Sequence, residues 1–254
     1  MTDKTKNPNA GHRARMRARF AKTGLEAMAD HEVLEMLLYY ALPRKDTNKL
    51  AHGILKEFGS LHSVFEASAA EIQKRCGLTE NTAVLLALVA PLARRYNLSK
   101  WGRRVSFKDA KSLGEYVNTL FIGETSECFY MLCLDNQVRL ICTTMLEKGT
   151  LDRTELYPRE IVGCALHNNA AYVILAHNHP SGGKTISNAD LVTTDRIIKL
   201  LAEVEVGVLD HIICCGNDYV SLAEKRLLGL RGVGGAAKEK KTLTAASESR
   251  IKPK

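Results

Sequence analysis

The sequence predicts an α/β fold in which an all-helical first part precedes a mixed sheet covered by helices on both faces. Two observations lead to this prediction. In the first part, apolar residues recur at helical spacing, whereas further along the chain short apolar strands alternate with helical segments. We therefore expect helical and sheet domains at residues 11–97 and 108–230, a linker at residues 98–107, and disordered segments at residues 1–10 and 231–254.

The composition is typical of a globular protein. The 254 residues are enough for two modest domains, and 45% of them are hydrophobic and 25% charged. The longest apolar run, residues 83–93, contains Pro91 and is too short to span a bilayer. The N-terminus has no apolar signal core, and seven cysteines without framework spacing are typical of a reducing compartment. We expect a cytoplasmic protein that does not bind a membrane.

Helices are expected throughout the first domain. Residues 11–20 form a run that is compatible with a helix, and Asp30 is placed to cap the next one. Thr47 begins a further helix that ends at Gly59, and a short helix begins at residue 68 or 69. This succession of short helices predicts a small helical domain.

The first of these helices is strongly basic, because it contains Arg13, Arg15, Arg17 and Arg19. These side chains either form a solvated helix face or contact phosphate groups. The net charge of +8 permits an acidic partner such as nucleic acid, without identifying one.

The second domain is expected to begin with a helix at residues 110–120. Strands at residues 129–134 and 138–144, joined by a turn at residues 135–136, form a hairpin that a loop to Leu156 follows. The remaining elements alternate: helix 159–167, strand 172–176, helix 188–204 and strand 208–215.

The most informative stretch follows strand 172–176. Side chains alternate across a strand, so His177 and His179 leave its end on the same face, and Pro180 prevents further pairing. Asp190 brings back a carboxylate shortly afterwards. Two imidazoles, one carboxylate and an open position for water make up a catalytic zinc site. We therefore predict a Zn2+ centre at these residues.

Each part of this pattern also has a structural interpretation. A single histidine is commonly a core or loop residue, and Ser187 followed by Asp190 is the pattern of a helix capping box. The two interpretations are compatible, because a helix start would hold Ser187 and Asp190 rigidly enough to serve a metal.

At these residues the sequence resembles a known family. His-Asn-His-Pro at residues 177–180, followed by six residues and then by Ser187 and Asp190, is similar to the JAMM signature of JAB/MPN-domain metalloproteases. Further segments resemble the bacterial RadC branch: residues 157–160, 176–182 and 210–211. The resemblance extends over residues 11–227.

This resemblance implies a three-layer α-β-α MPN/JAB domain, which is similar to the fold of cytidine deaminases. It also implies that zinc is bound by His177, His179 and Asp190, with Ser187 near the bound water.

The family pattern further requires a glutamate upstream, on the first strand of the domain. Glu127 leads an alternating strand and stands where the resemblance places this residue, so we predict that it is the general base. The alternatives are Glu124, Glu147 and Glu160. The last of these lies at an expected helix start, where acids are favoured by the helix dipole.

Together these residues predict the hydrolysis of an amide bond. Zinc with an open position lowers the pKa of a bound water towards about 7 and polarises a carbonyl. Glu127 could take the proton of the water and pass it to the leaving amine, and Ser187 could stabilise the oxyanion. The expected substrate is a protein or peptide, cleaved at a peptide bond or, as the resemblance implies for some relatives, at an isopeptide bond.

The helical domain resembles the helix-hairpin-helix module that RadC proteins carry in front of the metal domain. Residues 71–93 have the pattern of a helix, a tight turn at Gly77 and a second helix. In that module a glycine two residues later lets a backbone amide approach a DNA phosphate, and here this position is Thr79. Threonine obstructs close approach and is strained where φ must be positive. We therefore expect at most weak, non-specific DNA binding.

Two other functional classes compete with the hydrolase. The chain could be a DNA-associated, repair-linked module with a non-catalytic metal site, but a structural zinc site is normally closed by four protein ligands. A zinc-dependent nucleobase deaminase requires His-x-Glu and Pro-Cys-x-x-Cys. Neither motif occurs, and the adjacent Cys214 and Cys215 are more consistent with a core strand. The JAMM-type hydrolase is the leading hypothesis, and the DNA-associated module is the alternative.

Overall fold

The computed structural model describes four stretches of the chain: residues 11–102, 105–107, 109–149 and 158–229. The terminal segments that were expected to be disordered, and part of the loop expected before Leu156, lie outside these stretches. The chain divides after Ala93 into two compact units. Within the described stretches, no helix is both long enough and apolar enough to cross a bilayer.

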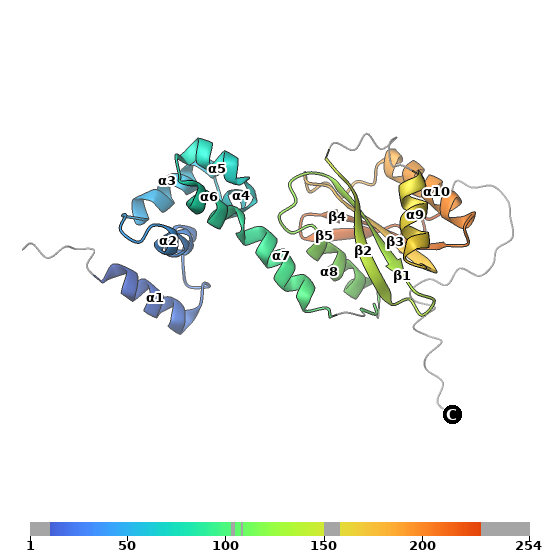
Figure 1. Ribbon diagram of the computed structural model, residues 1–254, viewed down its shortest axis with the longest axis horizontal. Coiled ribbons are helices and arrows are strands. Elements are labelled where there is room, and N and C mark those ends of the chain that lie inside the picture. Colours follow the sequence, from blue (N-terminus) through green and yellow to red (C-terminus); the bar gives the residue numbers. More distant parts are fainter. Residues whose placement is uncertain (1–10, 103–104, 108, 150–157, 230–254) are drawn as a thin grey trace, which may run out of the picture. The chain divides into compact units, whose positions relative to one another are not determined.

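Helices form the described part of the first unit, which confirms the all-helical first part (Figure 1). They are α1 (His12–Thr23), α2 (Asp30–Ala41), α3 (Asn48–Phe58), α4 (Leu61–Glu66), α5 (Ala69–Cys76), α6 (Glu80–Ala87) and the first residues of α7 (Val89–Ser99).

The core of the first unit forms around α2. Leu34 and Leu38 of this helix are fully buried among apolar side chains of α3, α4, α5 and α6. Asp30 is the first helical residue of α2 and not its cap, so the helix begins one residue earlier than predicted. The Glu32 carboxylate accepts a hydrogen bond from the backbone N of Ala29 at 2.9 Å. This bond caps the N-terminus of the helix with a side chain of its own first turn, so the Asp30 side chain is not needed as a cap.

α5 and α6 are separated by a turn at Gly77, which confirms the helix, tight turn and helix predicted for this segment. Gly77 ends α5 in the left-handed region, with φ of 61°, where glycine is favoured. Thr79 has φ of −66° and is the N-cap of α6, and its Oγ1 lies 2.9 Å from Oγ1 of Thr82. The backbone of Thr79 is therefore unstrained, and only the bulk of its side chain distinguishes this turn from one with glycine.

A five-stranded mixed sheet forms the centre of the described second unit, in the order β2-β1-β3-β4-β5. β3 and β4 are parallel, and the other neighbours are antiparallel. The strands are β1 (Cys128–Leu134), β2 (Leu140–Lys148), β3 (Tyr172–Asn178), β4 (Gly207–Cys215) and β5 (Asp218–Ser221), and the helices are α8 (Ala110–Leu120), α9 (Pro158–His167) and α10 (Asn188–Ala202). β5 was not predicted.

Helices cover both faces of this sheet, as the alternation of strands and helices predicted (Figure 1). Along β1, Tyr130 and Leu132 pack with the buried residues of α8, whereas Phe129 and Met131 pack with those of α9 and α10. Because both faces of the sheet are apolar, polar side chains that converge must do so near the ends of the strands.

Two segments differ from the prediction because their side chains belong to the sheet domain. α7 continues to Ser99, and Val105 and Phe107 of the expected linker are buried in the core that α8 completes. β2 extends to Lys148 and does not end at Thr144, because its pairing with β1 continues to the start of that strand.

A one-residue bulge in β4 changes which side chains reach each face of the sheet. Between Val208 and Asp210, β4 advances by two residues while its partner β3 advances by one, so Leu209 is an extra residue. As a result, His211 lies opposite Leu175 and points to the face that α9 and α10 cover. Regular alternation from Val208 would have turned Asp210 to this face and His211 to the other.

Candidate metal centre

The three predicted ligands converge where β3 ends and α10 begins. The structure places donor atoms of His177, His179 and Asp190 within 4.8 Å of one another. Nε2 of His177 lies 3.0 Å from Nε2 of His179 and 3.0 Å from Oδ1 of Asp190. Nε2 of His179 lies 3.8 Å from Oδ2 of Asp190. Two imidazole nitrogens and a carboxylate therefore face a common point.

Strand pairing holds His177 in place. This residue lies in β3 opposite Phe129 of β1, and only 2% of its surface is exposed. The Phe129 ring is nearly parallel to the imidazole, with an angle of 9° and a centroid distance of 6.2 Å. His179 follows just beyond the strand, two residues later, and its imidazole points in the same direction.

The second nitrogen of His179 is bound to the backbone. Its Nδ1 lies 2.9 Å from the carbonyl oxygen of Gly183. A carbonyl oxygen only accepts, so Nδ1 carries the ring hydrogen and donates it. In the neutral ring Nε2 then has the lone pair, which is the tautomer that binds a metal through Nε2.

Asp190 is held by the capping box that the sequence predicted. Its backbone N donates to Oγ of Ser187 at 3.1 Å, and its Oδ2 accepts from the backbone N of Ser187 at 2.7 Å. Burial alone would raise the pKa of the Asp190 carboxyl, but the hydrogen bond that Oδ2 accepts from the backbone N of Ser187 lowers it. The buried side chain is therefore an ionised carboxylate, the form that binds a cation.

This donor set fits a divalent metal such as zinc. Ligands at about 2.0–2.1 Å from a tetrahedral zinc lie about 3.3 Å from one another, and the separations in this group are 3.0, 3.0 and 3.8 Å. Three protein ligands leave one tetrahedral position for water or substrate. In the described part of the chain, no other cluster of His, Cys, Asp and Glu side chains is arranged to hold an ion.

Strand pairing separates two of the glutamate candidates. Glu127 directly precedes β1, and if the pairing of Phe129 with His177 is continued by two residues, Glu127 lies beside His179 on the face of the site. Glu147 lies opposite Phe129 on β2, which is one strand, or about 5 Å, further from β3. By register, Glu127 is the closer of the two to the ligands.

The other two glutamate candidates have different surroundings. Glu124 is buried and accepts hydrogen bonds from Lys148 Nζ at 2.6 Å and from Arg94. Burial alone would raise the pKa of Glu124, but the bonds and charges of Lys148 and Arg94 lower it, so this side chain is a structural carboxylate. Glu160 is exposed in the first turn of α9, where an acid complements the helix dipole.

The residue between the two histidines fixes the chain on either side of Glu127. Asn178 is the last residue of β3, and its side chain points to the opposite face from the imidazoles. Its Oδ1 accepts a hydrogen bond from the backbone N of Cys128 at 2.7 Å, and its Nδ2 donates to the backbone O of Ser126 at 3.0 Å. One amide thereby ties the segment that carries Glu127 to the strand that carries the ligands.

Two buried polar residues behind His177 were not predicted as site residues. His211 approaches the back of the His177 ring, and Thr194 of α10 contacts His211. His211 belongs to a segment that resembles the family, but regular alternation along β4 would have placed its side chain on the other face of the sheet. Thr194 lies one helical turn after Asp190, and this spacing could have indicated that both side chains lie on the same face of the helix.

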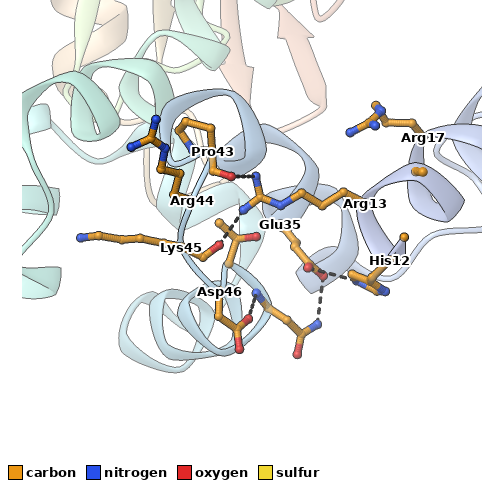
Figure 2. Close-up of a pocket in the computed structure, with 12 residues that line it drawn as sticks. His12, Arg13, Arg17, Glu35, Pro43, Arg44, Lys45 and Asp46 are labelled. Carbon is orange, nitrogen blue, oxygen red and sulfur yellow. Dashed lines mark hydrogen bonds and ion pairs between the residues drawn. The ribbon is translucent and has the colours of Figure 1, made fainter. Parts of the chain in front are cut away.

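The first unit contains a separate basic hollow of about 740 Å³, lined by the starts of α1 and α3 and by the loop between α2 and α3 (Figure 2). Arg17, Arg44 and Lys45 are among the residues that line it. Figure 2 shows the guanidinium of Arg13 directed at backbone oxygens of this loop, where it donates to Pro43 at 2.7 Å and to Lys45 at 2.6 Å. Arg13 therefore holds the loop in place.

The basic face that the sequence predicted on α1 is thus divided by function. Arg13 is bound to the loop, and Arg19 donates to the Glu32 carboxylate at 2.7 Å. These two arginines have structural roles, which reduces the charge that α1 can offer to a phosphate.

Sequence comparisons identify relatives of the second unit and of most of the chain. Residues 107–227 match the family model described as a RadC-like JAB domain. A UPF0758 protein of Pseudoalteromonas translucida (strain TAC 125) is 38% identical over 214 residues, which cover 84% of this chain and 96% of that protein. A UPF0758 protein of Fusobacterium nucleatum subsp. nucleatum is 36% identical over 229 residues, which cover 87% of this chain and 98% of that protein.

Proposed function

We propose that this chain, which belongs to the RadC family of JAB-domain proteins, is a zinc-dependent metallohydrolase of the JAMM type that cleaves a peptide or isopeptide bond. The observation that carries the proposal is the convergence of His177, His179 and Asp190 on one point. A structural zinc normally has four protein ligands, and in the described part of the chain no fourth ligand joins this group.

The residues around this point divide the chemistry among them. Zinc bound there would supply Lewis acidity, which lowers the pKa of a water and polarises a substrate carbonyl. Glu127 takes a proton from the attacking water and returns it to the leaving amine. The capping box holds Ser187 beside Asp190, and the Ser187 hydroxyl donates to the oxyanion. Asn178 holds the segment of Glu127 in position.

A mixture of protein substrates tests the proposal without assuming which bond is cleaved. Cellular proteins, including ubiquitin-like conjugates, are blocked at their existing amines, incubated with the zinc-loaded chain and searched for new amines by mass spectrometry. New α-amines indicate peptide hydrolysis, and new lysine ε-amines indicate isopeptide hydrolysis. His177→Ala should produce neither. A zinc-loaded chain that generates no more amines than His177→Ala would contradict the proposed activity.

One observation favours a second candidate function, that of a DNA-associated module with weak, non-specific binding and a non-catalytic metal site. Arg17, Arg44 and Lys45 line the hollow of the first unit, where phosphate groups could contact them. Such binding works by counterion release and should be lost near physiological salt. The test is a salt titration of duplex binding by the full chain. Tight binding that persists at high salt would make this function the first choice.

A further inference from the structure

A buried chain of hydrogen bonds connects two of the candidate ligands behind the metal centre. Nδ1 of His177 lies 2.8 Å from Nε2 of His211, and Nδ1 of His211 lies 2.6 Å from Oγ1 of Thr194. The Thr194 hydroxyl donates to the backbone O of Asp190 at 2.6 Å. His177 and Thr194 are each 2% exposed and His211 is 1% exposed, so water does not replace these bonds.

The donor and the acceptor of each hydrogen bond in this series follow from the bond between Thr194 and the backbone O of Asp190. The carbonyl oxygen of Asp190 can only accept, so Thr194 uses its one hydroxyl hydrogen there. Oγ1 of Thr194 must then accept from Nδ1 of His211. A neutral His211 ring that carries its hydrogen on Nδ1 has a lone pair on Nε2, which accepts from Nδ1 of His177. His177 is left with a lone pair on Nε2, the nitrogen that faces His179 and Asp190.

We infer that His211 is a positioning residue that, with Thr194, selects the tautomer in which His177 can bind a metal. The inference rests on the proposed metal centre and adds to it the residues that prepare one ligand. Metal-binding histidines commonly donate their other N–H to a carboxylate or a backbone carbonyl, as His179 does to Gly183. His177 donates to a second imidazole, which can accept only because Thr194 fixes the position of its hydrogen.

The surroundings of His211 keep its ring in the required position. Its backbone N donates to the carboxylate of Asp210 at 2.7 Å, and the same carboxylate accepts from Oγ of Ser221 at 2.6 Å on the neighbouring strand. The ring of Phe129 meets the His211 ring edge-on, at a centroid distance of 5.6 Å. His211 itself is not a ligand candidate, because both of its nitrogens are used behind His177.

Metal affinity tests this inference independently of any hydrolytic activity. The zinc-free full chain is titrated with zinc against a coloured chelator of known affinity. Thr194→Val keeps the shape of the side chain and removes the hydroxyl, and His211→Phe keeps a ring and removes both nitrogens. Each change should weaken zinc binding by about tenfold to a hundredfold, the usual effect of removing such a partner. Thr194→Ser keeps the hydroxyl and should bind zinc like the unaltered chain.

A spectroscopic measurement separates positioning from loss of folding. In the zinc-loaded chain, nitrogen-15 NMR of labelled histidine rings should show His211 neutral, with its hydrogen on Nδ1. His211 found with its hydrogen on Nε2, or zinc affinity unchanged in both Thr194→Val and His211→Phe, would overturn the inference while leaving the proposed function intact. An unaltered chain that binds no zinc would contradict both the inference about His211 and the proposed function.

Discussion

Each of the two units of the molecule buries a carboxylate beside histidine. The two environments differ in whether the hydrogen atoms of the histidine rings point towards the carboxylate or away from it. Glu35 in the first unit and Asp190 in the second are both 2% exposed. Each oxygen of Glu35 has its own donor: Nε2 of His12 at 3.1 Å and Nδ2 of Asn48 at 2.9 Å. Both carboxylate oxygens of Glu35 are therefore matched to donors within the protein, and in this sense the network is closed.

At Asp190 the ring hydrogens point away from the carboxylate. That of His179 is directed at Gly183, and that of His177, in our inference, at His211. Lone pairs of three side chains then face one another, an arrangement that is repulsive unless a cation lies among them. Each network joins a carboxylate that is 2% exposed to histidine, so the direction of the ring hydrogens is what we expect to distinguish a metal centre from a structural ion pair.

The largest expected effect is on metal content. The purified chain should hold about one zinc, as three converging ligands require, and His177→Ala or Asp190→Ala should remove nearly all of it, measured by elemental analysis. The absence of any metal in protein kept away from chelators would break the comparison, because the Asp190 network would then also be closed.

The next effect concerns catalysis at the same network. Glu127→Gln should keep its zinc and lose hydrolysis by about a hundredfold or more, the scale of removing a general base. Glu147→Gln is the matched control, because it lies on the same face one strand further out, and it should retain most activity. A reversed result would transfer the role of base to Glu147, and loss of zinc in Glu127→Gln would make Glu127 a ligand.

A smaller effect is expected at the closed network. Glu35→Ala leaves His12 and Asn48 without their acceptor and should lower the free energy of unfolding by about 2 kcal/mol, without changing zinc content. The control is Glu71→Ala, which breaks an exposed pair with Arg75 and should change stability by less than about 0.5 kcal/mol. Urea unfolding measures both changes. A loss of zinc in Glu35→Ala would show that the two networks are not independent.

The smallest effect is expected for DNA binding by the first unit. Because the backbone of Thr79 is unstrained, Thr79→Ala should leave duplex affinity nearly unchanged. Thr79→Gly removes the side chain that obstructs the turn and should strengthen binding by about tenfold at most, the value of one amide–phosphate hydrogen bond. Fluorescence anisotropy at low salt measures this. A much larger gain would show that the turn, and not the arginines, controls binding.

The convergence of His177, His179 and Asp190 could be predicted because their geometry is local. His177 and His179 are separated by the period of a strand, and Ser187 and Asp190 by one turn of a helix, so sequence spacing defines their directions. The position of Glu127 depends on the pairing of β1 with β3, which spacing does not reveal, and its assignment came from the family resemblance. Its catalytic role remains a prediction.

Other features depended on tertiary structure and were missed for that reason. Val105 and Phe107 lie in a polar, basic segment whose average composition indicated a linker, although these two side chains are core residues. His211 and Thr194 meet only because α10 packs on the face of the sheet to which the His211 side chain of β4 points. Neither helical nor strand periodicity in the sequence relates these two positions.

Because of the bulge, β4 contains one residue more than regular pairing with β3 requires. A chain shortened by Leu209 would pair regularly with β3 and still place His211 opposite Leu175, because the bulge already sets the phase on either side. Such a deletion should lower stability, since the Leu209 side chain packs in the core with α8, but should leave zinc affinity nearly unchanged. One extra residue in this strand would instead require a second irregularity. At this point the strand can lose one residue without changing the register of His211, whereas a deletion between His177 and His179 would turn one of the two imidazoles to the other face of the strand.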